Sequence, residues 1–190
     1  MIKLRCIVST RPDGGVSITH PSAEIMAIFT LGGAPEGYFG RLDWDAQIAS
    51  MTGRGIRESV AVRHVRALIS GGLTTAEAYE LIRDRDTASD WSGKELWARA
   101  ELPADRWFRD AWHRSANGGP IVINLSRAKS IQFREIKNAV DSENKRRQSD
   151  LELFDIPVAC DLAFFRERIR KASDERELRR IWPKELAWMS

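Results

Sequence analysis

One long helical segment, residues 124–150, constrains the fold more than any other feature of the sequence. Phe133, Ile136 and Val140 recur at the spacing of one helix face, which predicts an apolar stripe that packs on the rest of the chain. The stripe ends there, and the run SENKRRQSD at 142–150 contains no apolar residue. We therefore expect the far end of this helix to project into solvent or to meet a polar partner.

Shorter strand and helix patterns fill the rest of the chain. Apolar residues on both sides of RPDGG, residues 11–15, together with the Pro and Gly of that turn, predict a β-hairpin that opens the fold. Helical patterns follow at 23–31, 43–52, 56–70 and 74–85, the last with a capping box of Thr74 and Glu77. The second half begins with a strand-like alternation at 94–102 and a short β-rich run at 117–125. The long helix follows, capped by Asn124 or Ser126. A returning helix then contains Leu162, Phe165 and Ile169, and a last capped helix begins at Asp174.

These elements predict an α+β fold that is mainly helical, with an N-terminal β-hairpin, a short central β element and a C-terminal antiparallel helical hairpin. The small and polar stretch TASDWSG, residues 87–93, predicts a domain boundary. We expect a β-hairpin plus helical domain at 1–90 and a β element plus long helical hairpin at 91–190. With 43% hydrophobic and 30% charged residues, the composition is that of a globular protein, and no window is apolar enough to predict a membrane span.

Patterns that support catalysis or metal binding are missing from the sequence. The three histidines are scattered, and none has a cysteine or a carboxylate at the sequence spacing of a metal site. We therefore expect structural roles for His20, His64 and His113. Acidic residues at 84–95 have the spacing of a calcium loop, but Ala88 stands where an oxygen ligand is required. We therefore expect no metal, no cofactor and no enzymatic activity.

Basic residues are concentrated in the second half of the chain, where residues 101–190 carry 18 basic and 15 acidic side chains. A helix-turn-helix layout at 56–86 has a second helix with a net negative charge, the wrong sign for contact with phosphates. The long helix is the better electrostatic candidate, since 127–147 holds seven basic and three acidic residues. Its candidate nucleic-acid-binding residues are Lys137, Lys145, Arg146 and Arg147, although such faces also occur as solvated surface.

The aromatic segment ELPADRWFRDAW, residues 101–112, predicts a short helix that begins at Pro103. Phe108 and Trp112 fall on one side of that helix and Trp107 faces elsewhere, so the segment either anchors the preceding strand to the core or forms a docking edge for a partner. Tryptophan and arginine are enriched in interface hot spots. The candidate partner-binding residues are therefore Arg106, Trp107, Arg109 and Trp112.

The chain resembles a family of small, uncharacterised proteins that tailed bacteriophages and prophages encode near their tail and late structural genes. Those proteins share the signature LPxDRxFRxAW, a short β-run, a long helix that opens with AKxI, and an LD turn into a second helix. The residues that match are Leu102, Pro103, Asp105, Arg106, Phe108, Arg109, Ala111, Trp112, Ala128, Lys129, Ile131 and Asp155. The stretches TRPDGGVSITHPS and GGLTTAEAYELIRDRD are also similar to parts of such proteins.

The resemblance implies a phage context, and the lack of catalytic patterns favours a non-enzymatic protein that acts through protein–protein contacts. We expect a tail-associated virion component or assembly factor, made in the host cytoplasm and then present in the virion. Its expected partners are other phage structural proteins, those of the tail above all, or further copies of the chain, with neither a membrane nor nucleic acid as a partner. Two alternatives stay open: a DNA-associated or host-directed regulator that uses the basic helix 127–147, and a hydrolase whose site only the fold would reveal.

Overall fold

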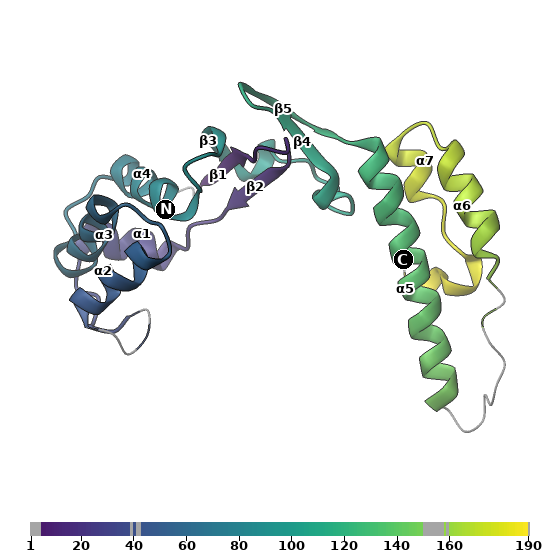
Figure 1. The fold of residues 1–190 in the computed structure, drawn as a ribbon, viewed down its shortest axis with the longest axis horizontal. Coiled ribbons are helices and arrows are strands. Elements are labelled where there is room, and N and C mark those ends of the chain that lie inside the picture. Colours follow the sequence, from purple (N-terminus) through teal and green to yellow (C-terminus); the bar gives the residue numbers. More distant parts are fainter. Residues whose placement is uncertain (1–4, 39, 41–42, 150–157, 159, 190) are drawn as a thin grey trace. The chain divides into compact units, whose positions relative to one another are not determined.

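The computed structural model of the chain describes residues 5–38, 40, 43–149, 158 and 160–189, without the side chains of 187–189. The chain forms two compact units, which Figure 1 draws from the N-terminus in purple to the C-terminus in yellow. Unit 1 comprises Met1–Ala104 and Arg114–Pro120, and unit 2 comprises Asp105–His113 and Ile121–Ser190. Helices predominate and the strands form small antiparallel sheets, so the predicted α+β class is confirmed.

Unit 1 contains a three-stranded antiparallel sheet in the order β2-β1-β3. The predicted N-terminal hairpin is confirmed as β1 (Arg5–Thr10) and β2 (Val16–Thr19), and β3 (Ser92–Ala98) pairs with the other edge of β1. As the central strand, β1 is buried without interruption from Cys6 to Thr10.

The four predicted N-terminal helices are confirmed as α1 (Ala23–Leu31), α2 (Trp44–Gly53), α3 (Glu58–Ser70) and α4 (Thr75–Asp86). Side-chain oxygens of Ser22, Asp43 and Thr74 accept hydrogen bonds from the first turns of α1, α2 and α4. The predicted capping box is present, because the Glu77 carboxylate accepts from the Thr74 main-chain N–H at 2.8 Å. Apolar side chains of α1, α3 and α4 pack with Ile7 of the sheet into one core.

The C-terminal ends of α1 and α3 approach each other at main-chain distance. Gly32 and Gly71 end these helices with φ of 78° and 62°, and Gly33 donates a main-chain hydrogen bond of 3.0 Å to the carbonyl of Ile69. A Cβ atom on Gly32 would lie 2.5 Å from the carbonyl carbon of Ser70. Glycine is required at this crossing both for its backbone conformation and for its lack of a side chain.

The predicted domain boundary at 87–93 is wrong. β3 begins inside that stretch and pairs with β1, with Ile7 opposite Leu96 and Val8 opposite Glu95. Unit 1 therefore continues through the 3-10 turn η1 (Arg99–Glu101) to Ala104. Small and polar residues marked a true break in secondary structure, but the pairing of distant strands decided which unit the following strand joins.

A second hairpin consists of β4 (Trp112–Ser115) and β5 (Gly118–Ile123), and its tip belongs to unit 1. The sequence predicted the β5 run but not β4. Arg114 has a fully buried side chain in unit 1, where it donates to the carbonyls of Gly119 at 2.8 Å and Gly93 at 2.7 Å. Its guanidinium also lies 2.5 Å from the Glu95 carboxylate. One arginine thus fastens the tip of this hairpin to β3.

Unit 2 contains α5 (Leu125–Ser149), α6 (Leu162–Lys171), α7 (Glu175–Arg179) and the 3-10 segment η3 (Lys184–Met189). Of the two candidate caps for α5, Asn124 fills the role, with its side chain accepting from the Arg127 N–H at 3.0 Å. The Lys129 ammonium near the start of α5 donates to the carbonyl of Arg170 near the end of α6, so the two helices run antiparallel as predicted. Figure 1 shows them side by side.

The expectation that α5 loses its packing after Val140 is partly wrong. Glu143 is buried one turn further on, and the Asn144 side chain accepts a hydrogen bond of 2.8 Å from the main-chain N–H of Val158. Ala139, Val140 and Val158 share a small cluster with Leu186. Buried contacts therefore extend along α5 beyond Val140 as far as Glu143, because Asn144 on the same turn is hydrogen-bonded to Val158, which is distant in the sequence.

Candidate functional site

The aromatic segment at 101–112 anchors unit 2, and its predicted helix is replaced by the single 3-10 turn η2 (Arg109–Ala111). An Asx turn, in which Asp105 accepts from the Trp107 N–H at 2.8 Å, takes the place of the expected first helical turn. Phe108 and Trp112 are each 1% exposed. The chain enters β4 at Trp112 directly after η2.

Trp107 does not face away from the protein, as the helix prediction implied. Its indole N–H donates to the Gln132 amide oxygen at 2.7 Å, and its ring meets that of Trp182 edge to face at 5.7 Å between centroids. The guanidinium of Arg179 lies 3.9 Å from the centroid of the Trp107 ring. Gln132 is itself fully buried and donates to the carbonyl of Ile181. Trp107 is therefore part of the packing of unit 2.

The four candidate partner-binding residues thus differ in their positions. Trp112 is buried and Trp107 is committed to internal contacts, so neither is available to a partner in this fold. Arg106 and Arg109 are exposed, and Arg109 lies 4.0 Å from the neighbouring carboxylate of Asp110. A docking role for this segment stays a prediction for Arg106 and Arg109 alone.

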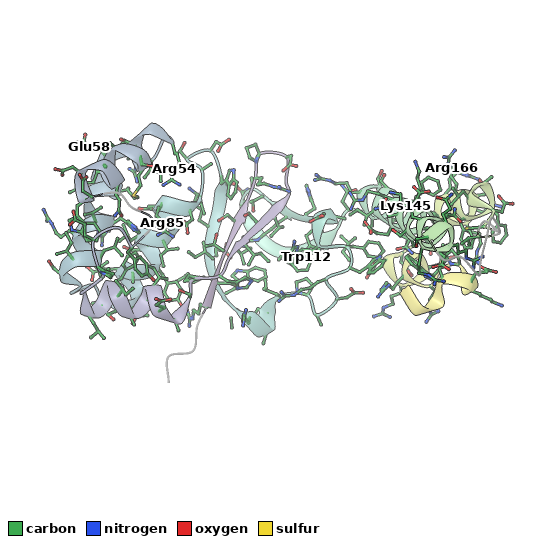
Figure 2. All side chains as sticks on the ribbon, turned by 90° about the horizontal axis from the view of Figure 1, so that it is seen from below. Arg54, Glu58, Arg85, Trp112, Lys145 and Arg166 are labelled. Carbon is green, nitrogen blue, oxygen red and sulfur yellow. The ribbon has the colours of Figure 1, made fainter. Side chains whose placement is uncertain are left out.

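Two of the four candidate nucleic-acid-binding residues serve the protein itself. Arg146 donates two hydrogen bonds of 2.8 Å to Glu143, and Arg147 donates one of 3.0 Å to the same carboxylate. These guanidinium groups hold the pKa of Glu143 well below its ordinary value, at about 2. Lys137 and Lys145 are exposed on α5, and Figure 2 labels Lys145.

Unit 2 presents an exposed aromatic ring beside a basic group on α6, a surface that we call the α6 face and define by Phe164 and Arg168. Phe164 is 53% exposed, an unusual state for a phenylalanine on a helix that already buries Phe165. The Arg168 guanidinium lies 5.7 Å from the Phe164 ring centroid. Arg166, two residues from Phe164 and so on another side of α6, lies 4.8 Å from the ring centroid of Phe133 on α5. Sequence reasoning missed this surface, although the run FFRER was its signal, because one helix cannot bury two adjacent aromatic residues on one stripe.

Unit 1 contains a cleft, the unit 1 cleft, made of two adjoining cavities. We call the one lined by Gln47 and His64 the inner cavity, with a volume of about 500 Å³, and the one lined by Trp91 and Lys94 the outer cavity, with a volume of about 720 Å³. The two cavities share the lining residues Arg54, Ile56, Arg85 and Asp86. The second half of α2, the connection 54–57 between α2 and α3, and the end of α4 with the segment that follows it supply most of the walls. Their volumes are in the range of small-molecule sites.

His64 lies in the wall of the inner cavity and is 1% exposed. Burial, together with the nearby positive charge of Arg85, lowers the pKa of His64 from 6.5 to about 3. Its Nδ1 atom is 3.5 Å from a guanidinium nitrogen of Arg85, and its ring packs edge to face on Phe29. The imidazole is therefore neutral at physiological pH, and the structural role predicted for His64 has a physical basis.

The acidic residues with calcium-like spacing at 84–95 in unit 1 include two that are engaged with arginines. Among the residues that the structure describes, no group of three or more His, Cys, Asp or Glu side chains is arranged to hold a metal ion. Asp84 and Asp86 of the calcium-like spacing form ion pairs with Arg83 and Arg85.

Across this described part of the chain, no helix combines the length and apolar composition needed to cross a bilayer.

Comparison of the chain with protein families, with curated proteins and with solved structures finds no match in any of the three.

Proposed function

We propose that this is a non-enzymatic phage or prophage protein that acts through protein–protein contacts, as a tail-associated virion component or assembly factor. The observation that supports contact through a surface is the exposed aromatic ring of Phe164, which lies beside Arg168 on the α6 face. The phage context rests on the sequence resemblance. We place the contact on α6 and not on the segment at 101–112, because the tryptophans of that segment are engaged inside unit 2.

The α6 face has the chemistry of an interface hot spot. An aromatic ring supplies apolar area, and a guanidinium group can leave water at a lower cost than an ammonium group and form paired hydrogen bonds with a carboxylate. Glu167 lies between Arg166 and Arg168 in sequence, but its carboxylate is held by Arg170 and Lys171 at 2.7 and 3.3 Å. Within the described part of the chain, Arg166 and Arg168 form no ion pair with a carboxylate.

This charge balance specifies the chemistry of the partner. A surface that fits the α6 face has an apolar pocket for Phe164, with a carboxylate at its rim for Arg168. Such a partner binds faster and more tightly at low ionic strength, because rim charges act mainly on the rate of association.

The test is to purify particles on a density gradient from the host that carries this gene and to measure the polypeptide by mass spectrometry. The experiment is repeated with Phe164→Ala and with Val122→Ala. Val122 is 52% exposed on β5 of the same unit, so its variant removes a comparable exposed apolar group outside the α6 face. We expect the native chain and Val122→Ala to co-purify with tail proteins at a fixed ratio, and Phe164→Ala to be lost from particles while its melting temperature is unchanged.

Two results would contradict the proposal in different ways. A chain that is made in the lysate but missing from particles excludes a virion component, and an assembly factor then requires the chain on immature particles. Incorporation of Phe164→Ala at the native ratio excludes the α6 face as the contact, because loss of a hot-spot aromatic costs about 2 kcal/mol or more of binding free energy.

The alternative function is a DNA-associated or host-directed regulator. One observation favours it: Arg166 covers the Phe133 ring, and Lys137 lies one helical turn from Phe133 on α5, so basic and aromatic groups alternate here. This function requires binding to an oligonucleotide that weakens steeply with salt and weakens further in Lys137→Ala. Binding that ignores salt, or an absence of binding at low salt, excludes it.

A further inference from the structure

The unit 1 cleft is separate from the α6 face and has features of a ligand site. Its inner part contains two polar side chains that are more than nine-tenths buried, Gln47 at 4% exposed and His64 at 1%. Ser50 lines the same part, together with the apolar side chains of Met51 and Ile56. A few convergent polar groups on a partly apolar wall are typical of sites that bind small molecules.

The neutral state of His64 determines what the inner part can hold. An uncharged imidazole and an amide form hydrogen bonds with hydroxyl, carbonyl or ring nitrogen groups without adding charge. Gln47 adds both donors and an acceptor. The inner part of the cleft is therefore suited to an uncharged polar ring and not to a charged group.

The outer part of the cleft has an excess of positive charge. Arg54, Arg57, Arg85 and Lys94 line it, against the carboxylates of Asp84 and Asp86. Asp86 is held by Arg85 through two hydrogen bonds, of 2.5 and 2.7 Å. Asp84 lies 3.1 Å from Arg83 but 3.8 Å from Arg57, so its charge is shared.

Within the residues that the structure describes, Arg54 and Lys94 line the outer part without a carboxylate partner. In the described residues their hydrogen bonds go to main-chain carbonyls, from Arg54 to Ser50 at 3.3 Å and from Lys94 to Ala88 at 2.9 Å. Glu58, on the first turn of α3, lines neither part of the cleft. Figure 2 labels Arg54, Glu58 and Arg85 in unit 1.

We propose that the unit 1 cleft binds a small phosphate ester that carries a polar ring, the chemistry that nucleotides and sugar phosphates share. Arg54 and Lys94 hold the phosphate in the outer part, and the ring lies in the inner part against Gln47 and His64. Trp91, which lines the outer part, adds an aromatic face. A phosphate is favoured over a single carboxylate because, among the described residues, two cations there have no carboxylate partner and a phosphate ester carries up to two negative charges.

The test is isothermal titration calorimetry of the full-length chain with adenosine monophosphate and ribose 5-phosphate, each compared with its unphosphorylated form and with inorganic phosphate. The variant is Arg54→Ala combined with Lys94→Ala. The matched control is Arg66→Ala, which removes an exposed arginine of α3 outside the cleft. We expect at least one phosphate ester to bind, and both dephosphorylation and the double variant to weaken binding about tenfold or more, as loss of hydrogen bonds to a charged group predicts.

Each outcome decides a point. Preference for the nucleotide identifies the ring as a base, preference for ribose 5-phosphate identifies it as a sugar, and inorganic phosphate alone is expected to bind more weakly than either ester. No heat with either ester at millimolar concentration, or equal binding by the double variant and Arg66→Ala, overturns the proposal. Phe164→Ala is expected to bind the ester like the native chain, so failure here and failure of the contact function are distinguishable.

Discussion

The crossing of α1 and α3 gives the sharpest prediction about the stability of unit 1, through the substitution Gly32→Ala. Gly32 has φ 78° and ψ −166°, a combination that side chains with a Cβ atom avoid. The new Cβ would also lie 2.5 Å from the carbonyl carbon of Ser70 and 2.7 Å from the nitrogen of Gly71, both main-chain atoms that cannot rotate away.

Two costs therefore add at Gly32. The positive φ costs about 1–2 kcal/mol for an L-residue, and forcing main-chain atoms apart costs about 1–3 kcal/mol more, so Gly32→Ala is expected to destabilise unit 1 by about 2–5 kcal/mol. Gly33 is a matched control because its φ is 85° but nothing lies within 4 Å of a Cβ there. Gly33→Ala should therefore lower the free energy of unfolding only by the backbone cost of about 1–2 kcal/mol.

Native-state hydrogen exchange measures this cost for unit 1 alone. The slowest amides of α3 report the opening of unit 1, while the amides of α5 in unit 2 serve as an internal reference. We expect protection in α3 to fall about thirtyfold or more in Gly32→Ala, since each ~1.4 kcal/mol is a factor of ten. Equal protection in Gly32→Ala and Gly33→Ala would refute the close approach of the two helix ends.

Three further predictions concern buried polar groups. As the pH falls from 6.5 towards about 3, unit 1 should lose up to about 1.4 kcal/mol per pH unit, because His64 protonates in the unfolded chain first, and His64→Gln should flatten this slope in urea unfolding. Trp107→Phe leaves the buried Gln132 amide oxygen without its donor, so unit 2 should lose about 1–3 kcal/mol, whereas an unchanged melting temperature would favour a docking role instead. Arg114→Lys keeps the charge but loses the guanidinium geometry that reaches three acceptors; we expect a loss of about 1.5–3 kcal/mol in urea unfolding, and a loss of a few tenths would contradict the fastening role.

Local patterns in the sequence were sufficient to predict most of the secondary structure. The hairpin at the N-terminus, the helices and the caps at Thr74 and Asp174 depend on residues within a few positions of one another. Turn chemistry, helix periodicity and capping act over that same range. These features were therefore predictable, and so was the antiparallel return of α6 on α5.

Tertiary structure alone decided which side chains are available to act. The sequence predicted an exposed Trp107, but its indole N–H donates to Gln132, which is 25 residues away in the chain. The sequence also made Arg146 a candidate for nucleic-acid binding, but it donates to the buried Glu143. The unit 1 cleft combines residues of α2, α3 and α4 with the segments that connect them, and the α6 face exists because α5 covers Phe165 and leaves Phe164 outside. Burial and ion pairing between distant residues depend on packing in three dimensions, and the period of a single helix does not contain that information.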